Sequence, residues 1–238
     1  MRYLPLILLA TLPVPAPLAA QTVTFGLPAG CTAYLTVQSL DCEVSHHFTC
    51  NTYATGVQGR VDIGEAGPTY IGTIDAEAQW VSSFNPDIGS TETLAPDPID
   101  PASFSALIGT GSDSYDFMTE NDQSGLLRFV GTDRLTGNKV TIDGVELEQT
   151  QLSISVQAED GTELWSTTGN EYISRDWRMF LSGPTETVTP EETFKADGSP
   201  VEFIFPGEAG FLSANPKHGC GAASSSLPTL PLLPPVAD

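Results

Sequence analysis

A mainly β structure is predicted: an antiparallel meander that forms a curved sheet or open barrel, with one short helix (about residues 100–109) packed on it. Apolar and polar residues alternate along many short segments, which is the pattern of half-buried strands. Turn-forming residues interrupt these segments about every ten residues between positions 114 and 181. Because the connections are short, neighbouring strands are expected to pair antiparallel.

The first expected element is a β-hairpin over residues 31–50. Both arms alternate apolar with polar residues, and a side-chain period of two puts each set on one face. The expected register pairs Cys31 with Cys50, Ala33 with Phe48, Leu35 with His46 and Val37 with Val44. This register places every apolar side chain of the hairpin on one side, and a slip of one residue would spoil it.

The hairpin also predicts how the four cysteines pair. Cys31 and Cys50 are cross-strand partners at a Cβ separation of roughly 4.5–5.5 Å, which needs little adjustment for a disulfide. Cys42 is separated from Cys50 by eight strand residues, about 26 Å, so these two are not expected to bond. The remaining bridge joins Cys42 to Cys220, and an even number of cysteines is typical of an oxidising compartment.

A metal site is the alternative for the same residues. Each of the three histidines, His46, His47 and His218, lies within four residues of a cysteine, and imidazole with thiolate suits zinc or copper. No C-x-x-C or H-x-H spacing is present, however, and adjacent strand residues such as His46 and His47 point to opposite faces. Disulfides are therefore the preferred interpretation, and a metal centre is kept only as the alternative.

Two further strands are expected before the helix. Residues 57–63 alternate apolar with polar side chains and end at a Gly- and Pro-containing turn. Residues 70–80 continue the alternation as one long half-buried strand, bent at Gly72.

The helix is predicted from its boundary residues. Asp100 suits the N-cap, Pro101 the first helical position, and Gly109 the left-handed position after the helix. Between them lies one apolar stripe, formed by Phe104, Leu107 and Ile108. So short a helix must be stabilised by packing on the sheet.

The rest of the chain continues the meander. Asp160-Gly161 is a strong hairpin turn because it tolerates the positive φ of tight hairpins, and residues 201–205 form one more strand. Residues 21–221 are therefore predicted to be a single β-rich domain. The Pro- and Ser-rich segment 222–238 has no periodicity and is predicted to be a disordered tail.

The N-terminal segment has the features of an export signal. Arg2 precedes an apolar stretch, and Ala19-Ala20 before Gln21 offers a cleavage point, so residues 1–20 are predicted to be a signal peptide. The stretch is too short to span a membrane, and no later segment qualifies. Gln21 stands where a lipoprotein needs a cysteine. The expected product is a soluble periplasmic or secreted protein.

The charge balance narrows the choice of partners. Acidic residues outnumber basic ones by 30 to 9, a formal net charge of −21. Loss of Arg2 with the signal peptide would leave 30 against 8, a net charge of −22. Such a charge repels nucleic acid and anionic lipid headgroups, so neither is an expected partner.

No catalytic motif is recognised. The sequence lacks the G-x-S-x-G, H-E-x-x-H, phosphate-loop and EF-hand patterns. One segment gathers basic and aromatic residues: Arg175 and Arg178 are candidates for binding a carboxylate or sulfate group, with Trp177 as a stacking surface. The alternative is that the two arginines only neutralise Glu171 and Asp176.

The leading functional hypothesis is an exported, non-enzymatic binding or carrier protein of undetermined specificity. Its partner is expected to be an apolar or amphiphilic ligand, or a protein, bound on the curved sheet. Trp80 and Phe104 are candidates for lining a cavity in that sheet. No cofactor is predicted. The alternatives are a periplasmic metal-binding protein that uses the cysteine and histidine cluster, and an extracytoplasmic hydrolase.

Overall fold

The computed structural model describes residues 24–221, which form one antiparallel sheet of 14 strands and one short helix. The strands are β1 (Cys31–Ser39), β2 (Val44–Cys50), β3 (Gln58–Gly64), β4 (Gly67–Ile74), β5 (Trp80–Asn85), β6 (Ser90–Leu94), β7 (Ser112–Asn121), β8 (Gly125–Ile142), β9 (Val145–Ala158), β10 (Glu163–Ser174), β11 (Met179–Leu181), β12 (Pro184–Val188), β13 (Thr193–Asp197) and β14 (Pro200–Ile204). The predicted signal peptide and tail, residues 1–20 and 222–238, lie outside the described range.

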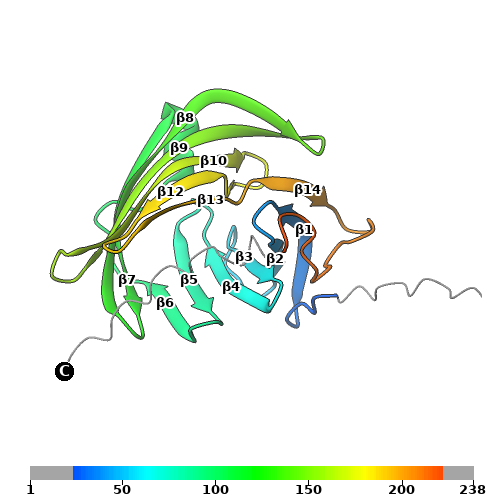
Figure 1. Cartoon of the computed structure of the whole chain (residues 1–238), viewed down its shortest axis with the longest axis horizontal. Helices are drawn as coiled ribbons and strands as arrows, with labels where there is room; N and C mark the ends of the chain where they lie inside the picture. Colours follow the sequence, from blue (N-terminus) through cyan, green and yellow to red (C-terminus); the bar gives the residue numbers. More distant parts are fainter. Residues whose placement is uncertain (1–23, 222–238) are drawn as a thin grey trace, which may run out of the picture.

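The predicted meander is confirmed. Successive strands pair from β1 to β10, β12 and β13 continue beyond β10, and β14 returns to pair with β1. The sheet bends round on itself, so that β1–β6 lie opposite β8, β9 and β10 (Figure 1). Within the described residues the sheet is not closed into a barrel, because its edge strands β13 and β14 do not pair with each other.

The first hairpin follows the expected register only at its open end. Cys31 lies opposite Cys50 and Ala33 opposite Phe48, as predicted. The register then shifts between Ala33 and Leu35, so Leu35 lies opposite His47 rather than His46. The same shift places Val37 opposite Ser45, and the predicted partner Val44 is wrong.

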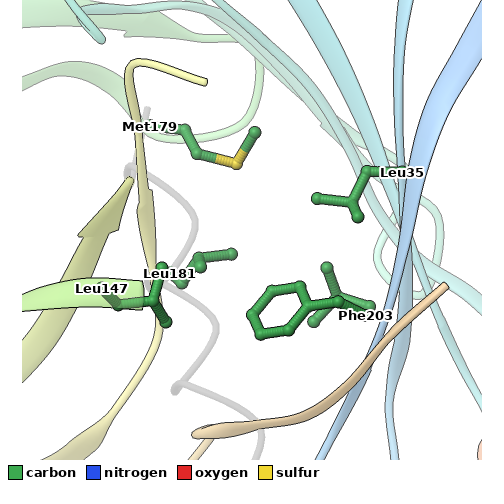
Figure 2. Packing of buried hydrophobic residues seen from close by; sticks show 6 residues of the cluster. Leu35, Leu147, Met179, Leu181 and Phe203 are labelled. Carbon is green, nitrogen blue, oxygen red and sulfur yellow. The ribbon is translucent and has the colours of Figure 1, made fainter. Parts of the chain in front are cut away.

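The shift turns apolar residues of the hairpin toward two different faces. Leu35 and Val37 enter the main core with Phe203, where side chains from β1, β9, β11 and β14 converge (Figure 2). Val44 and Phe48 belong to a second buried cluster, which is packed against segments near both ends of the described chain. Both faces of the hairpin are therefore buried, and the expectation of a single buried face is wrong.

Both predicted disulfides are present. The Cα atoms of Cys31 and Cys50 are 3.9 Å apart, and those of Cys42 and Cys220 are 4.7 Å apart. The second bridge ties the C-terminal end of the described chain to the turn between β1 and β2. Disulfides of this kind indicate an oxidising environment outside the cytoplasm.

The helix α1 (Phe104–Thr110) begins and ends later than predicted. Ser103, not Asp100, is the N-cap, and its Oγ accepts a hydrogen bond from the Ala106 amide at 3.1 Å. Gly111, not Gly109, takes the left-handed conformation after the helix, with φ of 87°. Asp100 is unavailable as a cap because its backbone forms a β-bridge with Asp116.

Pro101 accordingly lies before the helix instead of at its first position. Phe104 and Leu107 form the buried face of α1, packed with Ala78 and Ile173. Within residues 24–221 there is no helix of the length and apolar character needed to cross a membrane.

The long strand predicted over residues 70–80 is two strands. β4 ends at Ile74 and β5 begins at Trp80, with a tight turn between them. Asp75 builds this turn, since its Oδ1 accepts hydrogen bonds from the Glu77 and Gln79 amides at 2.8 and 3.0 Å. The alternating pattern continued through the turn and concealed it.

Candidate functional site

The inner face of the bent sheet encloses a hollow of about 330 Å³. Its lining comes from strands as far apart in the sheet as β2 and β11. Side chains from such distant strands can line one space only where the sheet curves around it. Pockets for small ligands typically occupy about 300–1,000 Å³, and the hollow lies at the lower end of that range.

One wall of the hollow is aromatic. Trp80 on β5 meets Phe129 on β8 edge to face, with ring centroids 5.3 Å apart, and Trp165 on β10 meets Phe129 at 6.4 Å. Phe117 on β7 stacks on Phe129 at 5.3 Å and supports it from the neighbouring strand. Trp80 remains 43% exposed although it lines the hollow, so its ring is accessible to a ligand.

Another part of the lining is polar. His47 and Arg60 are cross-strand partners on β2 and β3, and both line the hollow together with Tyr70 on β4. The Arg60 guanidinium lies over the Tyr70 ring, 4.9 Å from its centroid, and bonds Asp62 with an Nη2–Oδ2 distance of 3.0 Å. Burial and the adjacent Arg60 lower the pKa of His47 to about 3, so its imidazole is neutral.

A second acidic residue, Glu43, lies near Arg60 and Asp62. Glu43 accepts a hydrogen bond from the Thr69 hydroxyl at 3.2 Å, and Asp62 accepts one from Ser45 at 2.7 Å. Burial, and after it the repulsion of Asp62 and Asp41, raises the pKa of Glu43 to about 8. The Arg60 guanidinium is thus close to the carboxyl groups of both Asp62 and Glu43, and at neutral pH Glu43 keeps its proton.

Glu171 on β10 brings a carboxyl group directly to the hollow. Within the described part of the chain, this carboxyl has no hydrogen-bond or ion-pair partner. Burial, reinforced by Asp133 on β8, raises the pKa of Glu171 to about 8. Asp133 is itself opposite Asp113 in the β7–β8 ladder, and burial followed by that repulsion raises the pKa of Asp133 to about 7.

Several buried polar atoms on this face lack a hydrogen-bond partner among residues 24–221. His47 Nε2, Arg60 Nε and Thr119 Oγ1 belong to residues that line the hollow. His47 and Thr119 are only 5% and 2% exposed. A buried polar atom without a partner costs about 1–3 kcal/mol, so a molecule in the hollow that bonds these atoms would recover that energy.

The structure separates the two residues predicted to line a cavity. Trp80 lines the hollow, as described above. Phe104 is buried beneath α1, where it packs edge to face on Phe180 with ring centroids 5.8 Å apart, and it does not reach the hollow.

The basic and aromatic segment does not line the hollow, although the lining residue Gln58 donates a hydrogen bond to the Trp177 carbonyl at 2.8 Å. Arg175 bonds Glu148, with an Nη2–Oε2 distance of 2.9 Å, and Trp177 packs on Phe203 at 5.7 Å. Arg178 Nη2 bonds Glu77 Oε1 at 2.9 Å. The two arginines thus pair with acids other than the expected Glu171 and Asp176, and anion binding by Arg175, Trp177 and Arg178 stays a prediction.

The histidines do not converge. His46 stacks on Phe25 with centroids 5.3 Å apart and bonds Thr36, whereas His47 points to the opposite, inner face. His218 bonds Glu202 at 2.8 Å. Over the described residues, the metal-ligating atoms that cluster within 4.8 Å belong to Cys42, Glu65 and Cys220.

Two of those three residues are the cysteines of one disulfide. Among the described residues no cysteine is free, so the thiolate ligands of the metal alternative are not available in this oxidised state.

Sequence reasoning missed Arg60, Thr119, Trp165 and Glu171 as lining residues. The sequence does show which of these residues share a face of their strand. Trp165 and Glu171, for example, are six residues apart on β10 and therefore point to the same side of the sheet. What the sequence lacks is a local sign that this face turns toward β3 and β5.

Comparison of the chain with protein-family models, with curated proteins and with solved structures found no match.

Proposed function

We propose that this chain is an exported binding protein that holds one small amphiphilic molecule in the hollow of its curved sheet. The observation that carries the proposal is the composition of that hollow. One space of about 330 Å³ combines accessible aromatic rings with buried polar atoms that lack partners. An apolar lining with a few placed polar groups is the usual make-up of a small-molecule site.

Export accords with the two disulfides and with the predicted signal segment at residues 1–20. A rigid, disulfide-linked sheet also suits binding, because a preformed site loses little conformational freedom when its ligand arrives. The main core adjoins the hollow through Met179, which belongs to both. This core holds β1, β9, β11 and β14 together (Figure 2).

Fluorescence titration with the neutral apolar probe N-phenyl-1-naphthylamine tests the proposal. The chain has three tryptophans, and Trp177 lies outside the hollow. In a Trp177→Phe variant the remaining two, Trp80 and Trp165, both line it. We expect probe emission to rise, and tryptophan emission to fall, with saturation at one probe per chain.

The matched control is a Trp80→Phe, Trp165→Phe double variant, which keeps only Trp177 and leaves aromatic rings in the wall. Probe emission should still rise there, with much weaker transfer from tryptophan. If no saturable binding is seen for this probe or for octyl amphiphiles, the proposed function is wrong.

A further inference from the structure

We propose that the molecule held in the hollow is an organic cation, a protonated amine or quaternary ammonium with an apolar body. Glu171 would bind its charge, and the wall of Trp80, Phe129 and Trp165, farther along the hollow, would bind its apolar body. This inference rests on the proposed function and names the ligand class for the same site.

The first argument is the position of Glu171. Its carboxyl lines the hollow and, within the described residues, has no hydrogen-bond or ion-pair partner. The charged groups around it are Asp133 on β8, which repels its ionised form, and Arg60 on β3, which favours it. Arg60 is already bonded to Asp62 at 3.0 Å, so a ligand cation would be the close partner that Glu171 otherwise lacks.

The second argument is the chemistry of the aromatic wall. Trp80 and Trp165 both pack edge-on against Phe129, at interplanar angles of 83° and 77°. Trp165 lies six residues from Glu171 on β10, roughly 20 Å along the strand, so these rings would contact the apolar body of the ligand while its charge lies at Glu171. A second acid, Glu92 on β6, also lines the hollow and accepts a hydrogen bond from Asn121 Nδ2 at 3.1 Å.

An anionic ligand is disfavoured by the same geometry. Arg60 is the sole lysine or arginine among the residues that line the hollow in the described chain. Its charge is balanced by Asp62, with Glu43 and Asp41 close behind. The whole chain carries a net charge of −21, which draws cations and repels anions over long distances.

Proton release should accompany cation binding. Burial raises the pKa of Glu171 to about 8, so in the free protein this carboxyl is largely protonated at neutral pH. A bound cation favours the ionised carboxylate and displaces the proton. The other titratable neighbours are Asp133, with its pKa raised to about 7, and Tyr115, whose pKa is raised by burial so that it stays protonated over this range.

The test compares three probes that share one apolar chain: octyltrimethylammonium, octanol and octanoate. Binding to the wild-type protein is measured by calorimetry in about 0.15 M salt, which limits non-specific attraction to the acidic surface. We expect octyltrimethylammonium to bind about tenfold more tightly than octanol, and octanoate to bind most weakly. The affinity for the cation should rise between pH 6 and pH 8, roughly over the range in which buried carboxyls lose their protons.

Two variants localise the effect. Glu171→Gln should lose the preference for the cation while keeping its affinity for octanol, which shows that the hollow is intact. Glu159→Gln removes the same charge from an exposed turn residue and should behave as wild type.

The possible failures are distinct. If none of the three probes binds, the proposed function fails and this inference fails with it. If octanol or octanoate binds as tightly as the ammonium, the binding function stands and the cation inference is wrong. If Glu159→Gln weakens ammonium binding as much as Glu171→Gln does, the preference is a property of the surface charge and Glu171 is not the site.

Discussion

Trp80 and Phe129 meet edge to face with ring centroids 5.3 Å apart, although they lie on β5 and β8, with β6 and β7 between them in the sheet. On a flat sheet, strands this far apart would be separated by about 14 Å. The contact is therefore possible only because the sheet curves between β5 and β8, and this curvature forms the hollow. It also places an accessible indole at the ligand site that we propose.

Replacing Trp80 with alanine should weaken ligand binding and also lower stability. Its ring meets Phe117 and Phe129 edge to face but is 43% exposed, so we expect the free energy of unfolding to fall by about 1–3 kcal/mol. Loss of the ring should weaken binding of N-phenyl-1-naphthylamine about tenfold. Ile99→Ala, at a residue that is 69% exposed and outside the hollow, is the matched control and should change neither quantity. Unaltered probe affinity in Trp80→Ala would remove Trp80 from the site.

The end of α1 gives a prediction with opposite signs at two nearby glycines. Gly111 has φ of 87°, a left-handed conformation that costs other residues about 1–2 kcal/mol, so Gly111→Ala should destabilise the protein by that amount. Gly109 lies inside the helix with open space where a Cβ would stand. Gly109→Ala should therefore leave stability unchanged or raise it by up to about 1 kcal/mol. Urea unfolding of both variants checks where the helix ends. If Gly109→Ala is the destabilised variant, the helix ends at Gly109, as expected from the sequence, and not at Gly111.

Stability should decline as the pH rises from neutral toward 8. The pKa of Glu171 is about 8 in the folded protein, above its usual 4.5, so between these values the folded state binds more protons than the unfolded state. The stabilisation is complete below pH 4.5 and is lost as the pH rises to about 8. Glu43 and Asp133, with pKa values of about 8 and 7, act in the same direction.

The buried histidines make stability increase with pH, but only below about pH 6.5. The pKa values of His46 and His47 are lowered to about 4 and 3 from the usual 6.5, so their effect ends near pH 6.5. Free energies of unfolding measured from pH 6.5 to pH 8.5 should thus fall. The slope should be smaller in Glu171→Gln and unchanged in Glu159→Gln. A wild-type slope of zero or of positive sign would contradict the buried, protonated state of these acids.

The two disulfides should differ in their contribution to stability. Cys42–Cys220 closes a sequence separation of 178 residues, and Cys31–Cys50 one of 19. Because the entropy removed from the unfolded chain grows with loop length, the longer bridge should contribute about 5 kcal/mol and the shorter about 3 kcal/mol. Denaturation of the paired alanine variants measures both values. A larger loss from the Cys31→Ala, Cys50→Ala pair would show that local packing outweighs loop closure.

The strand pattern and both cysteine pairs were predictable because they depend on local alternation and on strand length. The register shift after Ala33 was not. It depends on burial of both faces of the hairpin, where Val44 and Phe48 are covered by Phe25 and Phe211 from segments distant along the chain. A single strand pattern does not reveal which distant segment will cover its second face.

The site was predictable only in part. Trp80 was a candidate because an aromatic residue on a half-buried strand suits a cavity wall. Arg60 and Glu171 come from β3 and β10 and share the hollow because the whole sheet curves. That curvature arises from twist and from bulges such as the one in the β8–β9 ladder between Leu135 and Lys139, and no short motif encodes it.

The most direct measurement is fluorine NMR of protein labelled with 5-fluorotryptophan, which reports separately on all three tryptophans. During titration with the octyl compound that binds best, the signals of Trp80 and Trp165 should shift together and saturate at one ligand per chain. The signal of Trp177, packed on Phe203 outside the hollow, should stay in place. Unchanged signals from Trp80 and Trp165 at saturating ligand, or a shift of Trp177 alone, would contradict a binding site in the curved sheet.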